Sequence, residues 1–190
     1  MNNLILDLES VNLSDEQFFQ LCVNNRDFRF ERNAQGDLVI MSPTGGETGN
    51  RNIEIAYQLQ AWSRKNKTGI AFDSSTGFKL PLGGTRSPDA SWITLEKWNS
   101  LSSEEQQRFL PLSPDFVIEL LSPTDKLLDT QRKMTEYIDN GTKLGWLINR
   151  SVKQVEVYRS QKSVEILENP SSLSGENILP GFSLDLELIW

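Results

Sequence analysis

One stretch limits the possible folds of this chain more than any other. It is the apolar run at residues 116–121, which lies between Pro114 and Pro123 and contains a single carboxylate, Glu119. Alternate residues of such a run point to opposite faces of a strand, and both faces are apolar apart from Glu119. A strand of this kind is normally central in its sheet and covered on both sides. The carboxylate of Glu119 therefore points into the interior, where it is costly unless it is paired, hydrogen bonded or bound to a metal.

The rest of the chain alternates between helical and strand patterns, without an internal repeat, a linker or a low-complexity segment. We therefore predict a single α/β domain over residues 1–190, with the tail at 179–189 packed back on the core. A capping box at Ser14 predicts a short first helix. Further helices are expected over about 15 residues after the glycine-rich turn at 42–49, at 95–110 and at 125–140. Strands are expected at 27–32, 37–42, 70–73, 77–81, 88–93, 145–149, 154–159 and 163–167. The first two strands are expected to form a hairpin through the turn at 33–36, and a second glycine-rich turn is expected at 83–87.

The glycine-rich turn has two possible roles. It is not a P-loop, because no Gly-Lys-Ser/Thr follows it. At a helix N-terminus it is able to hold an anion, but a tight connection between a strand and a helix is the simpler interpretation.

The chain contains no histidine and one cysteine, Cys22. This composition excludes Ser-His-Asp and Cys-His catalysis, histidine general bases, and zinc sites that use histidine or several cysteines. Any bound metal would have oxygen ligands, which suits Mg²⁺, Mn²⁺ or Ca²⁺. The single cysteine allows no intrachain disulfide, and neither a secretory signal nor a long apolar span is evident, so we expect a cytoplasmic protein without a membrane segment.

The formal net charge of −7 argues mildly against a protein that coats nucleic acid without regard to sequence. Net charge does not describe local patches, so a basic groove remains compatible with it.

Two acids and the helix that follows them are the best candidates for chemistry. Asp89 begins one predicted strand, and Glu119 lies in another about 30 residues later. If those strands are adjacent, the two carboxylates repel each other unless one is protonated or a cation lies between them. A divalent ion would fill that place and lower the pKa of a bound water. Lys133 or Gln131 from the next helix would orient that water, which describes metal-assisted hydrolysis of a phosphodiester.

Simpler interpretations exist for most of these residues. Asp89 follows a proline and would serve equally well as a turn residue, as would Asp115. Lys133 would pair with Asp129 across one helical turn. Only Glu119 is hard to explain in this way, because its strand is otherwise apolar.

The same residues resemble a known family. Four segments occur in order: Arg86-Ser87-Pro88-Asp89, the run from Pro114 to Pro123, Lys133-Met134-Thr135-Glu136-Tyr137, and Gly145-Trp146-Leu147-Ile148-Asn149. Together they are similar to the Uma family of putative restriction endonucleases, a branch of the PD-(D/E)XK nuclease superfamily. The resemblance implies a restriction-endonuclease-like fold, a mixed β-sheet flanked by helices, with a nuclease core at about residues 38–160. It also implies a site dependent on Mg²⁺ or Mn²⁺, in which Asp89 and Glu119 bind the metal.

The chain departs from the family pattern at two places. The motif lysine would fall two residues after Glu119, where the chain has Leu121, so the resemblance points to Lys133 on the next helix, with Gln131 as its neighbour. The family often has a histidine at the start of its first long helix, and this chain has none there. Glu47 would then supply an additional acid, with Glu54 as its substitute.

Two functions follow from this pattern. The first is a metal-dependent endonuclease that hydrolyses DNA, in which Lys133 assists the water or the scissile phosphate, and which acts as a homodimer if it cuts both strands. The second is a catalytically inactive protein on the same scaffold that binds nucleic acid or another protein. The acidic balance and the displaced lysine favour the second function, whereas the retained acids favour the first.

Overall fold

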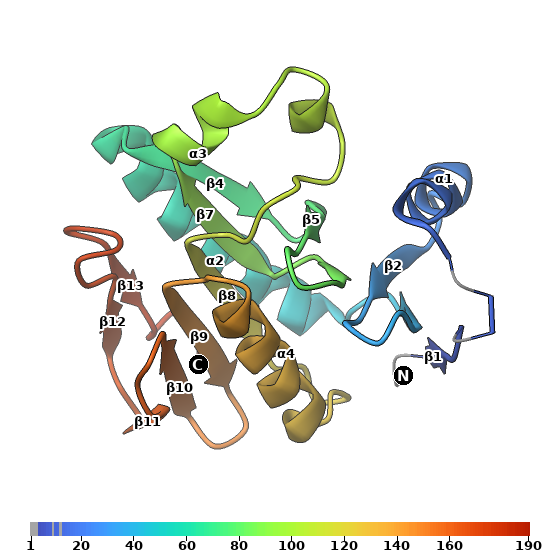
Figure 1. Cartoon of the computed structure of the whole chain (residues 1–190). Coiled ribbons are helices and arrows are strands. Elements are labelled where there is room, and N and C mark those ends of the chain that lie inside the picture. The colour runs from blue at the N-terminus through green and yellow to red at the C-terminus, as the bar shows by residue number, and fades with distance from the viewer. Residues whose placement is uncertain (1–3, 9, 12) are drawn as a thin grey trace.

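The computed structural model describes residues 4–8, 10, 11 and 13–190. The apolar run forms strand β8 (Phe116–Leu120), which lies inside a six-stranded sheet of order β11-β10-β9-β8-β7-β4 (Figure 1). β8 is antiparallel to β7 and parallel to β9, so the sheet is mixed. Its other strands are β4 (Gly69–Asp73), β7 (Ala90–Thr94), β9 (Leu144–Asn149), β10 (Gln154–Arg159) and β11 (Glu165–Glu168).

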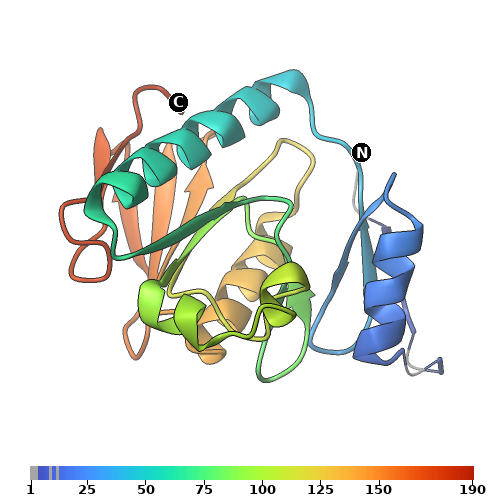
Figure 2. The ribbon, with the colours of Figure 1, turned by 90° about the horizontal axis from the view of Figure 1, so that it is seen from above.

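Two long helices cover opposite faces of this sheet (Figure 2). Helix α2 (Gly46–Asn66) packs on one face, where Phe116 and Ile118 of β8 lie in the same apolar core as Ile55 and Leu59. Helix α4 (Leu127–Asp139) packs on the other face, where Val117 shares a core with Met134 and Tyr137. Every residue of β8 is buried, as expected for a central strand covered on both sides.

α4 connects the parallel strands β8 and β9, which is the usual way to join two parallel neighbours. The helix ends at Asp139, and Gly141, which follows the cap residue Asn140, has a φ of +99°, a conformation that glycine adopts at little cost. The residues at the start of α4 therefore lie close to the C-terminal end of β8, where Glu119 is found.

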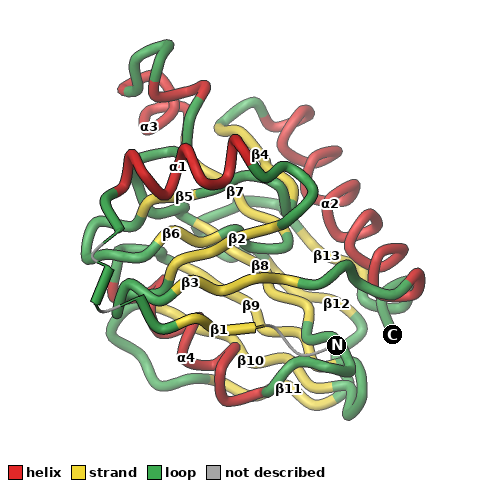
Figure 3. The backbone as a smooth tube through the Cα atoms, turned by 90° about the vertical axis from the view of Figure 1, so that its right-hand side faces the viewer, coloured by secondary structure: helices red, strands yellow, loops and turns green. Residues whose placement is uncertain are grey.

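The N-terminal part of the chain forms a second sheet beside the first, of order β1-β3-β2-β6-β5 (Figure 3). Its strands are β1 (Leu4–Leu6), β2 (Arg29–Arg32), β3 (Leu38–Met41), β5 (Phe78–Lys79) and β6 (Thr85–Arg86). β2 and β3 form the predicted hairpin, and Arg32 pairs with Thr85 of β6. Helix α1 (Asp15–Asn24) begins at the predicted capping box of Ser14 and Gln17.

The tail packs back on the core, as predicted, and it does so on the α2 side of the main sheet. Strands β12 (Ser172–Ser174) and β13 (Ser183–Asp185) form a small antiparallel pair there. Leu179, Phe182 and Ile189 are buried in the same core as β8. In the part of the chain that the structure describes, no helix is long and apolar enough to cross a membrane.

Three of the predicted boundaries were wrong. The helix after the glycine-rich segment has 21 residues rather than about 15, because it begins at Gly46 within that segment. The segment at 83–87 is not only a turn, since Thr85 and Arg86 form β6. The helix predicted at 95–110 is instead α3 (Leu95–Ser100) followed by a separate 3-10 turn, Glu105–Gln107.

The break after α3 has a local cause. Leu101 is extended, and Ser102 then starts a new capped turn with Glu105. The Glu105 amide donates to Ser102 Oγ at 3.2 Å, and Glu105 Oε2 accepts from the Ser102 amide at 2.8 Å. A capping box belongs to the start of a helix, so it ends α3 rather than extending it.

Candidate metal centre

The two acids singled out from the sequence lie opposite each other at one end of the main sheet. Ala90 pairs with Ile118 in the antiparallel register of β7 and β8, and one further step along that register brings Asp89 beside Glu119. The Leu120 amide donates a hydrogen bond of 2.8 Å to Asp89 Oδ2. Asp89 and Glu119 both line a cleft of about 1350 Å³.

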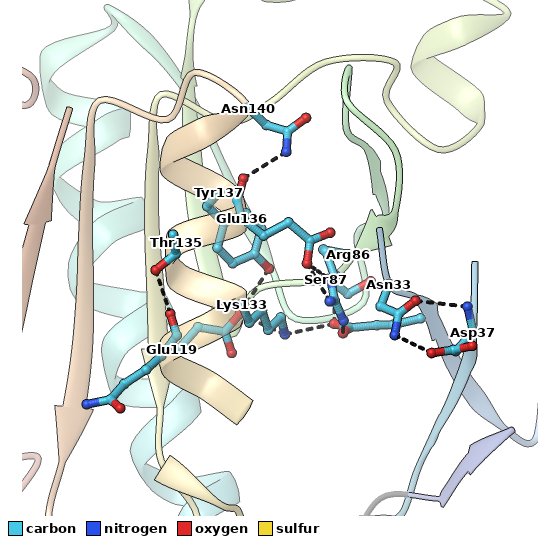
Figure 4. A network of polar contacts seen from close by, with 12 residues as sticks. Asn33, Asp37, Arg86, Ser87, Glu119, Lys133, Thr135, Glu136, Tyr137 and Asn140 are labelled. Atoms are coloured by element: carbon cyan, nitrogen blue, oxygen red, sulfur yellow. Dashed lines mark hydrogen bonds and ion pairs between the residues drawn. The ribbon is translucent and has the colours of Figure 1, made fainter. Parts of the chain in front are cut away.

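Glu119 is held by two side chains of α4 (Figure 4). Its Oε1 lies 2.8 Å from Lys133 Nζ and accepts a 3.0 Å hydrogen bond from the Tyr137 hydroxyl. Lys133 and Tyr137 are one helical turn apart, so they reach the same carboxylate from one face of α4. Glu119 is 7% exposed. Burial raises its pKa, Lys133 lowers it, and the nearby charges of Asp89 and Glu31 raise it again, to about 7.

Lys133 lies between two acids. Its Nζ is 2.8 Å from Glu119 Oε1 and 2.8 Å from Glu31 Oε1, and Glu31 is a residue of β2. Burial by itself would lower the pKa of Lys133, but Glu119 and Glu31 outweigh it and hold that pKa above its ordinary range. Lys133 is therefore held as a cation and a hydrogen-bond donor between the two carboxylates.

Asp89 is held from α2 as well as from β8. Asn52 Nδ2 donates to Asp89 Oδ1 at 2.9 Å. Burial raises the pKa of Asp89, and the hydrogen bonds and the charge of Lys133 offset this effect only in part. Asn52 Oδ1 is buried and has no hydrogen-bond donor among the described residues. An orphaned carbonyl oxygen beside a carboxylate is a position where a hard cation or a water is favoured.

The charges in this cluster leave room for a divalent cation. The charged residues that act on one another in this cluster are Arg29, Glu31, Arg86, Asp89, Glu119, Lys133 and Glu136, four acids and three bases, which gives a formal charge of −1 when all are ionised. Asp89 and Glu119 provide oxygen ligands, which Mg²⁺ and Mn²⁺ prefer. In the part of the chain described by the structure, no group of three His, Cys, Asp or Glu side chains is preassembled to hold a metal. Mg²⁺ is commonly held by one or two carboxylates with water and substrate phosphate as the other ligands, so an acid pair fits it.

Two of the other predicted site residues have partners of their own. Gln131 lines the cleft, but its Nε2 donates to Glu156 Oε1 at 2.7 Å. Glu47 is exposed at the start of α2, where it pairs with Arg150 at 2.5 Å. Glu54, its substitute, accepts a hydrogen bond from Gln58. The structure thus brings Lys133 to the acid pair, but it does not bring Glu47 or Glu54 into a group of three acids there.

The simpler interpretation of Lys133 does not hold. Asp129 lies 3.4 Å from Arg132, whereas Lys133 turns inward to Glu119 and Glu31. Ion pairs between residues four apart stabilise the surface of a helix, but the Lys133 ammonium points to the buried side of α4 and away from Asp129.

Glu31 and Asn52 contact the predicted site residues but were not singled out from the sequence. Glu31 is 2% exposed although it lies in a short hairpin strand, where alternation with the apolar Phe30 would place it on the polar face. Asn52 is uncharged, and two acids of the same helix, Glu47 and Glu54, are the more obvious metal ligands in the sequence. An amide, unlike an acid, adds an oxygen near Asp89 without adding negative charge.

Comparisons with known proteins bear on the family and the fold of the chain. A family model described as Uma2, putative restriction endonuclease, matches residues 15–187. Among solved structures, the chain is similar to a putative nuclease of the DUF820 group from Anabaena variabilis, with a TM-score of 0.72 and 20% sequence identity. The alignment covers 84% of this chain and 88% of that one. At this identity the likeness concerns the fold, and it confirms the predicted mixed sheet flanked by helices. No match was found among curated proteins.

Proposed function

Because this chain belongs to the Uma2 family of putative restriction endonucleases, we propose that it is a metal-dependent endonuclease that hydrolyses phosphodiester bonds of DNA. The observation that carries the proposal is the acid pair Asp89 and Glu119, which face each other across β7 and β8 in a large cleft beside Lys133. Membership of this family supports a nuclease activity. The dependence on a metal ion and the DNA substrate are our proposal.

Asp89 and Glu119 would hold Mg²⁺ or Mn²⁺. The ion, when bound, would polarise a phosphate oxygen and lower the pKa of a water. Tyr137 fixes the orientation of Glu119 through its hydroxyl, and Asn52 with the Leu120 amide fixes Asp89. The carboxylates are thus held in place by hydrogen bonds before any ligand arrives, which reduces the reorganisation needed during reaction.

Lys133 would act on the phosphate. Two of its three N–H groups face Glu31 and Glu119, which leaves one donor for a substrate oxygen. A protonated amine beside the scissile phosphate stabilises the negative charge that develops there. This role suits a lysine whose pKa is raised, whereas activation of water by Lys133 as a base does not.

The charge of the cleft makes a cation necessary for this substrate. Among the described residues that line it, nine are Asp or Glu and five are Lys or Arg. An acidic cleft repels a polyanion, and a bound divalent ion reduces that repulsion where the phosphate must lie. A non-catalytic nucleic-acid-binding module would require a basic surface, and this cleft does not favour it.

Metal binding and cleavage test the proposal together. Isothermal titration with Mg²⁺ or Mn²⁺ should show binding by the wild type and loss of binding in Asp89→Asn and Glu119→Gln. Supercoiled plasmid, linear duplex and single-stranded DNA should then be cleaved with Mn²⁺ and not with a chelator. A wild type that binds no divalent ion at millimolar concentration would refute the metal site. Cleavage that persists in Glu119→Gln would refute the assignment of the acids.

A further inference from the structure

Glu31 makes more contacts within the cluster than a hairpin residue normally would. It lies on β2, outside the nuclease core predicted at residues 38–160, and 102 residues before Lys133. Its Oε1 accepts from Lys133 Nζ at 2.8 Å and from the Ser87 amide at 2.9 Å. Its Oε2 accepts from Arg86 Nη1 at 3.1 Å. One buried carboxylate therefore joins the hairpin, the segment leading to Asp89, and α4.

The Glu31 carboxylate is itself held in place. Arg86 binds it through Nη1, and the same guanidinium donates through Nε to Glu136 Oε2 at 3.1 Å (Figure 4). Arg86 is 8% exposed, so this arrangement is largely shielded from solvent. A carboxylate that accepts hydrogen bonds at both oxygens has little freedom to rotate. The side chains bound to it are therefore also held in fixed positions.

The orientation of Lys133 depends on Glu31 because a lysine side chain is otherwise flexible. Its ammonium is a point donor on a stem of four methylene groups, unlike the planar fork of arginine. Glu119 alone would leave the amine free to rotate about one contact. The second contact, to Glu31, determines where the remaining N–H can point.

We propose that Glu31 is a positioning residue of the cleavage site, which directs the Lys133 ammonium toward the scissile phosphate and anchors the main chain at Ser87, two residues before Asp89. The catalytic part of this inference, that Lys133 acts on a phosphate, rests on the proposed function. It also makes the N-terminal hairpin part of the active site, although the hairpin lies outside the predicted core.

A structural role and a positioning role predict different results in a double-mutant cycle. If Glu31 acts through Lys133, Glu31→Gln should lower kcat about 10- to 100-fold with little change in KM, as is typical when a supporting hydrogen-bond partner is lost. The same change should cost nothing further in a Lys133→Ala background. A role in stability alone would leave kcat per folded molecule unchanged in Glu31→Gln.

The matched control is Asp115→Asn. Asp115 is also a buried acid bound by lysines, but it is not among the residues that line the cleft. Its kcat per folded molecule should equal that of the wild type, with the folded fraction measured by circular dichroism. If Glu31→Gln does not fold, Glu31→Asp keeps the charge for Arg86 but shortens the reach to Lys133, and should still lower kcat. A kcat within twofold of the wild type in the folded variant, or additive losses in the double variant, would overturn the proposal.

A second measurement is independent of cleavage. In nitrogen-15 NMR, the Lys133 ammonium is assigned by its absence in Lys133→Ala, and its protons should exchange slowly in the wild type and faster in Glu31→Gln. An unchanged resonance would overturn the positioning role. If the wild type cleaves no DNA with either metal, the proposed function fails, and this experiment still decides whether Glu31 holds Lys133.

Discussion

A buried acid lies at each end of β8, and the two acids differ in how well nearby lysines compensate their negative charge. Asp115 precedes the strand and is 0% exposed, and Glu119 near its other end is 7% exposed. Asp115 has two lysines, Lys97 at 3.1 Å and Lys143 at 2.9 Å, and it also accepts from the Thr94 amide at 3.0 Å. Glu119 shares its one lysine with Glu31 and lies beside Asp89.

The pKa values of the two acids shift in opposite directions. Burial would raise the pKa of Asp115, but Lys143, the Thr94 amide and Lys97 outweigh it, and that pKa lies below its ordinary value. Burial raises the pKa of Glu119, and one shared lysine does not compensate for two neighbouring acids. Asp115 is therefore neutralised by the fold itself, whereas Glu119 is left with negative surroundings that a metal ion would relieve.

The largest expected difference between the two ends is in activity. Glu119→Gln should reduce kcat/KM about 10³-fold, the equivalent of several kcal/mol of lost metal-assisted stabilisation. Asp115→Asn should leave kcat/KM per folded molecule unchanged. Plasmid cleavage with Mn²⁺ measures both, and equal losses in the two variants would show that the comparison does not separate function from stability.

The pH dependence of stability should come from the Glu119 end. The folded pKa of Glu119 is about 7 and its ordinary value is 4.5, so the folded state binds this proton more tightly than the unfolded state does. The free energy of unfolding should thus fall as pH rises from about 4 to about 8, by about 3 kcal/mol. Urea unfolding without metal should show this decrease in the wild type and a much smaller one in Glu119→Gln. Added Mg²⁺ should restore stability at pH 8 in the wild type.

Truncation of the acid side chain at the Asp115 end of β8 should lower the free energy of unfolding. Asp115→Ala removes a hydrogen bond to the Thr94 amide and the partner of Lys97 and Lys143, both of which can turn toward solvent. We expect a loss of about 2 to 3 kcal/mol in urea unfolding at pH 7. A loss below 0.5 kcal/mol, the ordinary range for surface changes, would contradict its role as an anchor of β8.

The smallest expected effect is at Tyr137, which touches only the Glu119 end. Tyr137→Phe removes the 3.0 Å hydrogen bond to Glu119 and keeps the ring in the core. Stability should fall by about 1 kcal/mol, and kcat should fall modestly if the hydroxyl helps to orient the carboxylate. Thermal unfolding and initial cleavage rates check these values, and an increase in kcat would show that the hydrogen bond hinders the site.

Sequence patterns were informative where the signal is local. The single carboxylate of an apolar strand identified Glu119, and helical spacing placed Lys133 on the element that follows it. The hairpin of β2 and β3, the central position of β8 and the packing of the tail were predicted in the same way. Each depends on alternation, helical period or turn residues within about 15 positions.

The partners from distant parts of the chain were not predictable in this way. Glu31 pairs with a residue 102 positions away, and its strand looks like part of an exposed hairpin. Asn52, rather than Glu47 or Glu54, reaches Asp89 because the register of α2 against β7 depends on packing and not on charge. Asp115 was interpreted as a turn residue, since the two lysines that bury it come from separate segments.

The register of β7 and β8 has a consequence for how this protein can vary. Successive strand residues face opposite sides of a sheet, so a one-residue slip of β8 would turn Glu119 into the apolar layer beneath α2. Insertions and deletions should therefore be excluded from both strands. The connection between them contains α3 and the 3-10 turn. It should accept changes in length provided that the pairing register of β7 and β8 is kept.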